Sequence, residues 1–173
     1  MNDMPYLARK VTRAKWDRRD GLAENEIPAD AVTMDLRTTD NTLSFWKCET
    51  PSDGEIRDTV LALATAAERV DRMDIVWLEE NILRVYRISL NPSDGRTPVA
   101  GLRRKHVDVV KLDLGRLSKV AELTAQALTH GQHCRLTKKE IIEIIVEAVR
   151  QNLVSIDELQ SKVKEEVEKA IVI

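Results

Sequence analysis

Two histidines and a cysteine lie within five residues of each other, at His130, His133 and Cys134, where they could bind a metal ion. Structural zinc sites use four side-chain ligands, often in pairs at a fixed spacing, and catalytic zinc sites use three ligands and a water. Here the remaining ligands would have to come from distant parts of the chain, and His106 is the only other histidine. A polar loop between two helices accounts for the same residues, so we predict no metal and no cofactor.

Basic residues gather in two stretches of the chain, near residues 9–19 and 96–105. Cations bind phosphates and a neighbouring aromatic ring can stack on a base, so this pattern is compatible with nucleic-acid binding. Aspartates interrupt or flank both stretches and no named nucleic-acid-binding motif is present, so solvated surface charge is the simpler interpretation. The residues of the nucleic-acid hypothesis are Arg9, Lys10, Arg13, Lys15, Trp16, Arg103, Arg104 and Lys105.

Carboxylates on predicted strands are the remaining candidates for catalysis. Asp35 and Glu49 could point inward, but one carboxylate on a strand is ordinary. Side chains alternate along a strand, which places Lys111 and Asp113 on one face and Asp108 on the other. The sequence contains no G-x-S-x-G, H-E-x-x-H, P-loop or G-x-G-x-x-G motif. We therefore predict no particular catalytic residue, and an enzyme with a site assembled from scattered residues stays open as an alternative.

The composition is that of a chain able to fold around a core in about one domain. Of its 173 residues 43% are hydrophobic and 32% charged, and a formal net charge of -2 provides no general attraction for nucleic acid or anionic lipid. We expect no signal peptide and no membrane association, because no uncharged run approaches the roughly 20 residues that a bilayer requires. Cys48 and Cys134 form no C-x-x-C pair, which favours a reducing, cytoplasmic environment.

The most specific patterns in the sequence lie at residues 136–173. Thr137 with Glu140, and Ser155 with Glu158, each match the capping box Ser/Thr-x-x-Glu. In this motif the hydroxyl and the carboxylate accept hydrogen bonds from backbone amides that are otherwise unpaired at a helix N-terminus. Hydrophobic residues follow each box at helical spacing, which predicts two amphipathic helices joined by a very short turn.

The preceding residues mix strand and helix patterns. Residues 6–19 predict a short strand or an irregular arm, and the alternating segments 32–37 and 43–49 flank turn-forming residues, which predicts a hairpin. We further predict a helix that opens at Ser52 or Asp53, a central strand at 73–78, strands at 85–90 and 107–112 with a loop at 91–98 between them, and a helix at 115–128 ended by Gly131.

Together these patterns predict an α+β fold. An antiparallel or mixed sheet with a covering helix occupies residues 1–113, and a part with three helices occupies 114–173, although the two parts could form one continuous domain. The apolar stripe at the C-terminal end is suited to packing either into the protein's own core or against the surface of a partner. The residues of this stripe are Ile156, Leu159, Val163, Val167, Ile171 and Ile173.

The leading functional hypothesis is a non-catalytic accessory or antitoxin-like subunit that acts by binding another protein or a second copy of itself. It depends on the apolar stripe and on the lack of a recognisable catalytic motif. The alternatives are a nucleic-acid-associated protein that uses the two basic stretches, and an enzyme.

Overall fold

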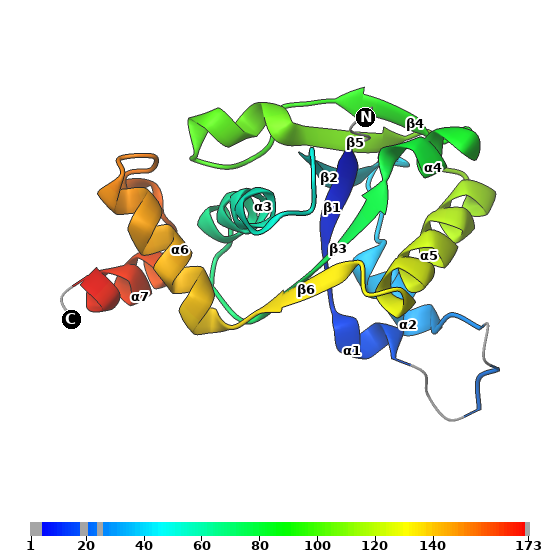
Figure 1. The fold of residues 1–173 in the computed structure, drawn as a ribbon, viewed down its shortest axis with the longest axis horizontal. Helices are drawn as coiled ribbons and strands as arrows, with labels where there is room; N and C mark the ends of the chain where they lie inside the picture. The colour runs from blue at the N-terminus through cyan, green and yellow to red at the C-terminus, as the bar shows by residue number, and fades with distance from the viewer. Residues whose placement is uncertain (1–4, 18–20, 24–25, 172–173) are drawn as a thin grey trace.

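The computed structural model describes residues 5–17, 21–23 and 26–171. Across these residues the fold is α+β, as predicted, with one six-stranded sheet in the order β4-β5-β2-β1-β3-β6 (Figure 1). Every neighbouring pair of strands is antiparallel. The strands are β1 (Tyr6–Val11), β2 (Leu43–Cys48), β3 (Met73–Glu79), β4 (Ser89–Pro92), β5 (His106–Val110) and β6 (His133–Leu136).

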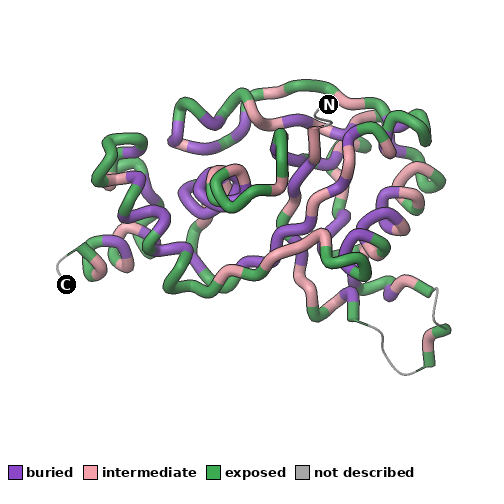
Figure 2. Tube along the Cα trace, viewed as in Figure 1, coloured by how far each residue is buried: buried purple, intermediate pink, exposed green. Residues whose placement is uncertain are grey.

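Helices cover both faces of the sheet, so the sheet separates two hydrophobic cores (Figures 1 and 2). The helices are α1 (Arg13–Trp16), α2 (Ala29–Asp35), α3 (Asp53–Thr65), α4 (Glu80–Val85), α5 (Leu114–Thr129), α6 (Lys138–Arg150) and α7 (Ser161–Ile171), with the 3-10 turns η1 (Ala100–Lys105) and η2 (Ile156–Glu158).

Strand β3 illustrates why the sheet needs a cover on each side. Ile75 packs into the core beneath α3 and α6, whereas its neighbour Val76 packs into the core beneath α5. Successive side chains of a strand point to opposite faces, so a nearly continuous apolar run is stable only between two layers. The predicted central strand is therefore confirmed, because β3 pairs with β1 on one side and with β6 on the other.

The predicted strand at residues 32–37 is wrong, because residues 32–35 belong to helix α2 and Leu36 is its C-terminal cap. Six alternating residues are too few to distinguish a period of two from a period of 3.6. In the helix, Ala31 and Asp35 lie one turn apart and are both buried. The predicted hairpin is consequently absent from the described residues, and β2 pairs instead with β1 and β5.

The predicted strand at residues 85–90 is also partly wrong. Helix α4 continues to Val85, and the chain then turns through Arg87, whose φ of 55° lies in the left-handed region. Strand β4 begins only at Ser89 and pairs with β5, so the long loop predicted at 91–98 starts after Pro92. Helix α4 was missed because it is one and a half turns long and lacks a capping side chain.

The segment predicted as a loop between helices contains strand β6. Gly131 does end helix α5, with a φ of 75°, as predicted. The chain then returns to the sheet, where Cys134 pairs with Ile75. Short edge strands of this kind are decided by the neighbour whose backbone groups they pair, and not by their own sequence. The proposed boundary at residue 113 stays a prediction.

Both capping boxes at the C-terminal end are present. The first begins α6, as predicted, with Thr137 N–H donating to the Glu140 carboxylate at 2.7 Å and Glu140 N–H donating to the Thr137 hydroxyl at 3.3 Å. The second begins the 3-10 turn η2, and α7 starts only at Ser161. The connection between the two helices is therefore longer than the predicted very short turn.

We expect Thr137→Ala to lower the free energy of unfolding by about 1 kcal/mol, because the first turn of α6 loses an acceptor for its backbone amide. Thr137→Ser keeps the hydroxyl and should stay close to the wild type. Urea unfolding followed by circular dichroism measures both variants, and equal losses in the two would contradict a capping role.

Candidate functional site

A serine, a histidine and an aspartate form a hydrogen-bonded chain where β4 meets β5. Ser93 directly follows β4, and His106 and Asp108 lie two residues apart on β5, so they share one face of the strand. The Ser93 hydroxyl oxygen lies 2.8 Å from His106 Nδ1 and 2.6 Å from Asp108 Oδ2. Antiparallel pairing of β4 with β5 brings the serine to the other two residues.

Strand β2 supports the aspartate from the other side. Ser44 is the register partner of Asp108, and its hydroxyl donates to Asp108 Oδ1 at 3.0 Å. Each carboxylate oxygen thus accepts a bond from one serine hydroxyl. No cation among the described residues forms an ion pair with this half-buried carboxylate, so its charge is balanced only by neutral donors.

The hydrogen bonds of Ser93 favour one tautomer of His106. The Ser93 hydroxyl has one proton, and it donates that proton to Asp108. Its oxygen then accepts from His106, which requires a proton on Nδ1 and leaves the lone pair on Nε2. Burial lowers the pKa of His106 below its ordinary value against the opposing charge of Asp108, which favours the neutral ring. The Nε2 atom has no hydrogen bond to any of the described residues and is not among their buried unpaired atoms.

His106 opens onto a hollow of about 670 Å³ between the end of α3 and the sheet. That volume is within the range of small-molecule sites, which combine an apolar wall with a few convergent polar groups. The apolar wall consists of Trp46, Ala62, Leu63, Ala66 and Ala67. The polar lining consists of Thr39, Asp40, Thr42, Ser44, Ser93, Asp94, Arg96, His106 and Asp108.

The loop that carries Ser93 is held rigidly over Trp46. Gly95 N–H donates to the carbonyl of Arg103 at 2.9 Å, and the Thr97 hydroxyl lies 3.1 Å from that of Thr65. A Cβ atom at Gly95 would lie 2.4 Å from Trp46 Cη2, so only glycine allows this approach. The Trp46 ring also meets His106 edge to face, with centroids 5.1 Å apart. The imidazole is thus oriented by packing and by hydrogen bonds.

The depressed pKa of His106 predicts a pH-dependent stability. Below the ordinary pKa of 6.5 the unfolded chain binds a proton at this position more readily than the folded chain. The free energy of unfolding should therefore fall as the pH decreases from neutral to about 5, and His106→Gln should reduce this dependence. Urea unfolding across this pH range measures it, and an identical dependence in the variant would contradict the assignment.

Sequence reasoning missed this site. It compared Asp108 with Lys111 and Asp113, and treated His106 only as a third histidine. The His-x-Asp spacing on a strand was a usable signal, because it places both side chains on one face. No local pattern could have added Ser44, which is 64 residues from Asp108 in the sequence.

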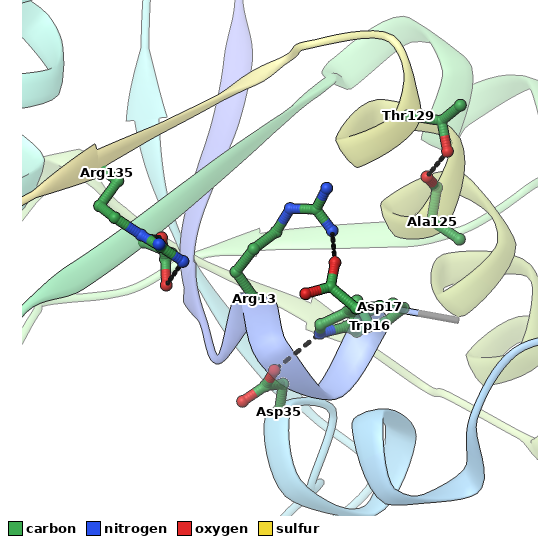
Figure 3. A network of polar contacts seen from close by, with 8 residues as sticks. Arg13, Trp16, Asp17, Asp35, Ala125, Thr129 and Arg135 are labelled. Atoms are coloured by element: carbon green, nitrogen blue, oxygen red, sulfur yellow. Dashed lines mark hydrogen bonds and ion pairs between the residues drawn. The ribbon is translucent and has the colours of Figure 1, made fainter. Parts of the chain in front are cut away.

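Two residues of the first basic stretch, Arg9 and Trp16, form internal contacts with Asp35, and Figure 3 shows the bond from Trp16. The buried Trp16 donates from Nε1 to Asp35 Oδ2 at 2.7 Å, and Arg9 donates to the Asp35 carbonyl and lies over the Phe45 ring. Burial lowers the pKa of Arg9 to about 10, although Asp35 opposes the shift, so the guanidinium remains charged at neutral pH.

The other cations of the first stretch differ in their surroundings. Arg13 pairs with Asp17, and Lys15 lies 3.5 Å from Asp30. Lys10 is exposed. Residues 18 and 19 of this stretch lie outside the described residues.

The second basic stretch lies in η1, across the sheet from α1 (Figure 1). Lys105 donates to Asp58 at 2.9 Å and to Glu55 at 3.2 Å, and these bonds outweigh its partial burial and raise its pKa. Arg103 donates to the Thr97 carbonyl, whereas Arg104 is exposed. The described residues of the two stretches therefore form no continuous basic surface.

The predicted interaction stripe packs mostly into the protein's own core. Leu159, Val163 and Val167 are buried in the core that also contains α3 and α6, and Ile156 packs against it. Ile171 is 37% exposed. Ile173 lies outside the described residues. This arrangement leaves little of the stripe available to a partner.

The histidine and cysteine segment provides no ligand set. No group of three or more His, Cys, Asp or Glu residues within the described parts of the chain could hold a metal ion. His133 and Cys134 lie on β6, and the buried Nδ1 atom of His133 has no hydrogen-bond partner. Burial raises the pKa of both thiols, Cys48 and Cys134, to about 11, so both remain protonated at neutral pH.

Three exposed apolar side chains lie at the end of α4 and at the start of α5. Val85 is 69% exposed, Tyr86 46% and Leu114 83%. The Lys119 ammonium lies 4.8 Å from the centroid of the Tyr86 ring, which joins the two helices at this point. Exposed apolar residues that gather in one place are common at protein interfaces. We call these three residues the α4–α5 patch.

The fold and the site define an α+β protein with a polar hollow at an antiparallel sheet. No protein-family model matches the chain, and comparisons with curated proteins and with solved structures find no similar protein. No helix in the described ranges is long and apolar enough to span a membrane. Function must therefore be argued from the site itself.

Proposed function

We propose that the protein binds a small polar molecule in the hollow, with His106 as a proton acceptor. The observation that carries this proposal is the position of the Ser93 hydroxyl, 2.8 Å from His106 Nδ1 and 2.6 Å from Asp108 Oδ2. The Nε2 atom of His106 has a free lone pair, and His106 lines a hollow large enough for a small molecule. The imidazole of His106 is suited to general acid–base catalysis, in which a neutral histidine accepts a proton from the ligand.

The arrangement favours His106 over Ser93 as the reactive group. A serine nucleophile needs a base that accepts its proton, and a histidine is the usual base. Here the serine proton points to a carboxylate and the imidazole donates to the serine oxygen. Ser93 and Asp108 are then positioning residues, which hold the ring in one tautomer.

Nitrogen-15 spectra of the imidazole groups test the tautomer. In the wild type at neutral pH, we expect His106 to carry its proton on Nδ1. Ser93→Ala removes the acceptor and should move the proton to Nε2, while Ser118→Ala, on the outer part of α5, should leave His106 unchanged. A wild-type His106 protonated on Nε2 would overturn the assigned role.

A screen of small polar compounds tests ligand binding. Compounds that bind should shift the backbone amide signals of Ser44, Gly95 and His106, and the shifts should disappear when a bulky side chain fills the hollow, as in Ala66→Phe. The matched variant Ala14→Phe lies on the exposed side of α1 and should retain them. If no compound shifts these signals, the hollow is not a ligand site.

A second candidate function is the one that the sequence suggested first, a subunit that binds another protein. The α4–α5 patch favours it, because each of its side chains is more exposed than every described residue of the C-terminal stripe. Leu114→Ser should then abolish co-purification of a partner from nuclease-treated lysate, or lower the mass measured by light scattering. Leu153→Ser, in the connection between α6 and η2, is a matched control because that residue is also exposed. Equal behaviour of the two variants would contradict a role of the patch.

A further inference from the structure

We infer that the hollow selects a ligand that carries a protonated amine. This inference rests on the proposed function and specifies its ligand. It follows from the hydrogen-bond donors and acceptors around His106 and Asp108. The charge of the lining and the ring of Trp46 favour the same class of ligand.

Around His106 and Asp108, the groups that line the hollow have free hydrogen-bond acceptors, whereas their donors are already paired. The hydroxyls of Ser44 and Ser93 both donate to Asp108, and in the tautomer assigned above His106 Nδ1 donates to Ser93. What remains is the Nε2 lone pair and the free lone pairs of the Asp108 carboxylate. A ligand that binds to these groups must therefore bring several donors. A primary ammonium group has three donors and no acceptor, which meets this requirement.

The side chains that line the hollow include more negative than positive charges, which favours a protonated amine. Three carboxylates line the hollow, at Asp40, Asp94 and Asp108, and none of them forms an ion pair among the described residues. Arg96 is the one lysine or arginine in the lining, and it is exposed. A half-buried carboxylate without a counter-charge is stabilised by a cation that enters the site.

The apolar side of the hollow also suits a cation. Trp46 lines it, and a tryptophan ring is the strongest of the aromatic partners for a positive charge. The side chains of Ala62, Leu63 and Ala66 can contact the methylene carbons of an alkyl amine. A divalent metal ion is a poorer fit, because no metal-ligand cluster lies in the described parts of the chain.

Three probes of equal length test the charge of the ligand, namely diaminobutane, butanediol and succinate. Each is titrated into the labelled full-length protein near neutral pH, at constant ionic strength and with a chelator present. We expect only the diamine to shift the signals of Gly95 and His106 in a saturable way. Asp108→Asn should weaken this binding at least about tenfold, since the ammonium loses its charged acceptor.

Two further variants separate specific binding from general attraction. Asp71→Asn removes a carboxylate that does not line the hollow and should leave the affinity unchanged. Arg96→Gln removes the opposing cation and should increase the affinity. Equal weakening by Asp108→Asn and Asp71→Asn would overturn the inference, because it would indicate non-specific attraction.

The outcomes distinguish this inference from the proposed function. If butanediol or succinate shifts the same signals as strongly as the diamine, the hollow is a ligand site and the selection for amines is wrong. If none of the three probes shifts these signals, the selection for amines is also wrong, and the compound screen then decides whether the hollow binds any ligand.

Discussion

The substitution Asp35→Ala is expected to lower the free energy of unfolding by about 3 to 5 kcal/mol, the range for removing one partner of a buried charged network. Asp35 is only 8% exposed, and its carboxylate accepts bonds from Trp16 Nε1 and from both the amide and the hydroxyl of Thr12. Alanine leaves all three donors without an acceptor and removes the nearest counter-charge of Arg9. Urea unfolding followed by circular dichroism measures the loss.

The reason for so large an effect is that Asp35 joins three elements. Its contacts connect the end of β1, the helix α1 and the helix α2 (Figure 3). A helix as short as α1 is not stable alone, so its position depends on these tertiary contacts. Asp71→Ala, which removes an exposed carboxylate, should change the stability by less than about 0.5 kcal/mol. A comparably small loss for Asp35→Ala would contradict the role of the network.

The second large effect is expected for Val167→Asp, which should lower the free energy of unfolding by about 4 kcal/mol. Val167 is fully buried in the hydrophobic core formed with α3 and α6, where a carboxylate would lose its contact with water. Hydrogen exchange should show that the amides of α7 lose their protection first, because the substituted residue lies in this helix (Figure 1).

This prediction also decides between the two explanations of the C-terminal stripe. Lys162→Asp introduces the same side chain at an exposed position of α7 and should leave the stability nearly unchanged. If the stripe instead formed an interface between molecules, Val167→Asp would leave a stable chain and lower the mass measured by light scattering. That result would contradict packing of α7 on the protein's own core.

The candidate site could be predicted from the sequence only in fragments. The residues His106 and Asp108 are two apart, so their common face follows from the alternation of a strand. Pairing of β4 with β5 brings Ser93 to the site, and the register between β2 and β5 brings Ser44 to it. Neither pairing follows from a local pattern, because it depends on which strands the packed helices bring together.

The sequence by itself determined the features that arise within one turn or one strand. The capping box of Thr137 and Glu140, the end of α5 at Gly131 and the apolar run of β3 each depend on interactions between residues close in sequence, or on burial of a single segment. Only the tertiary structure decided that residues 32–35 are helical and that residues 133–136 form a strand. Both segments are short, and contacts with distant partners outweigh the small differences in their intrinsic propensities. For Asp35 these partners are Thr12 and Trp16, and for Cys134 the partner is Ile75.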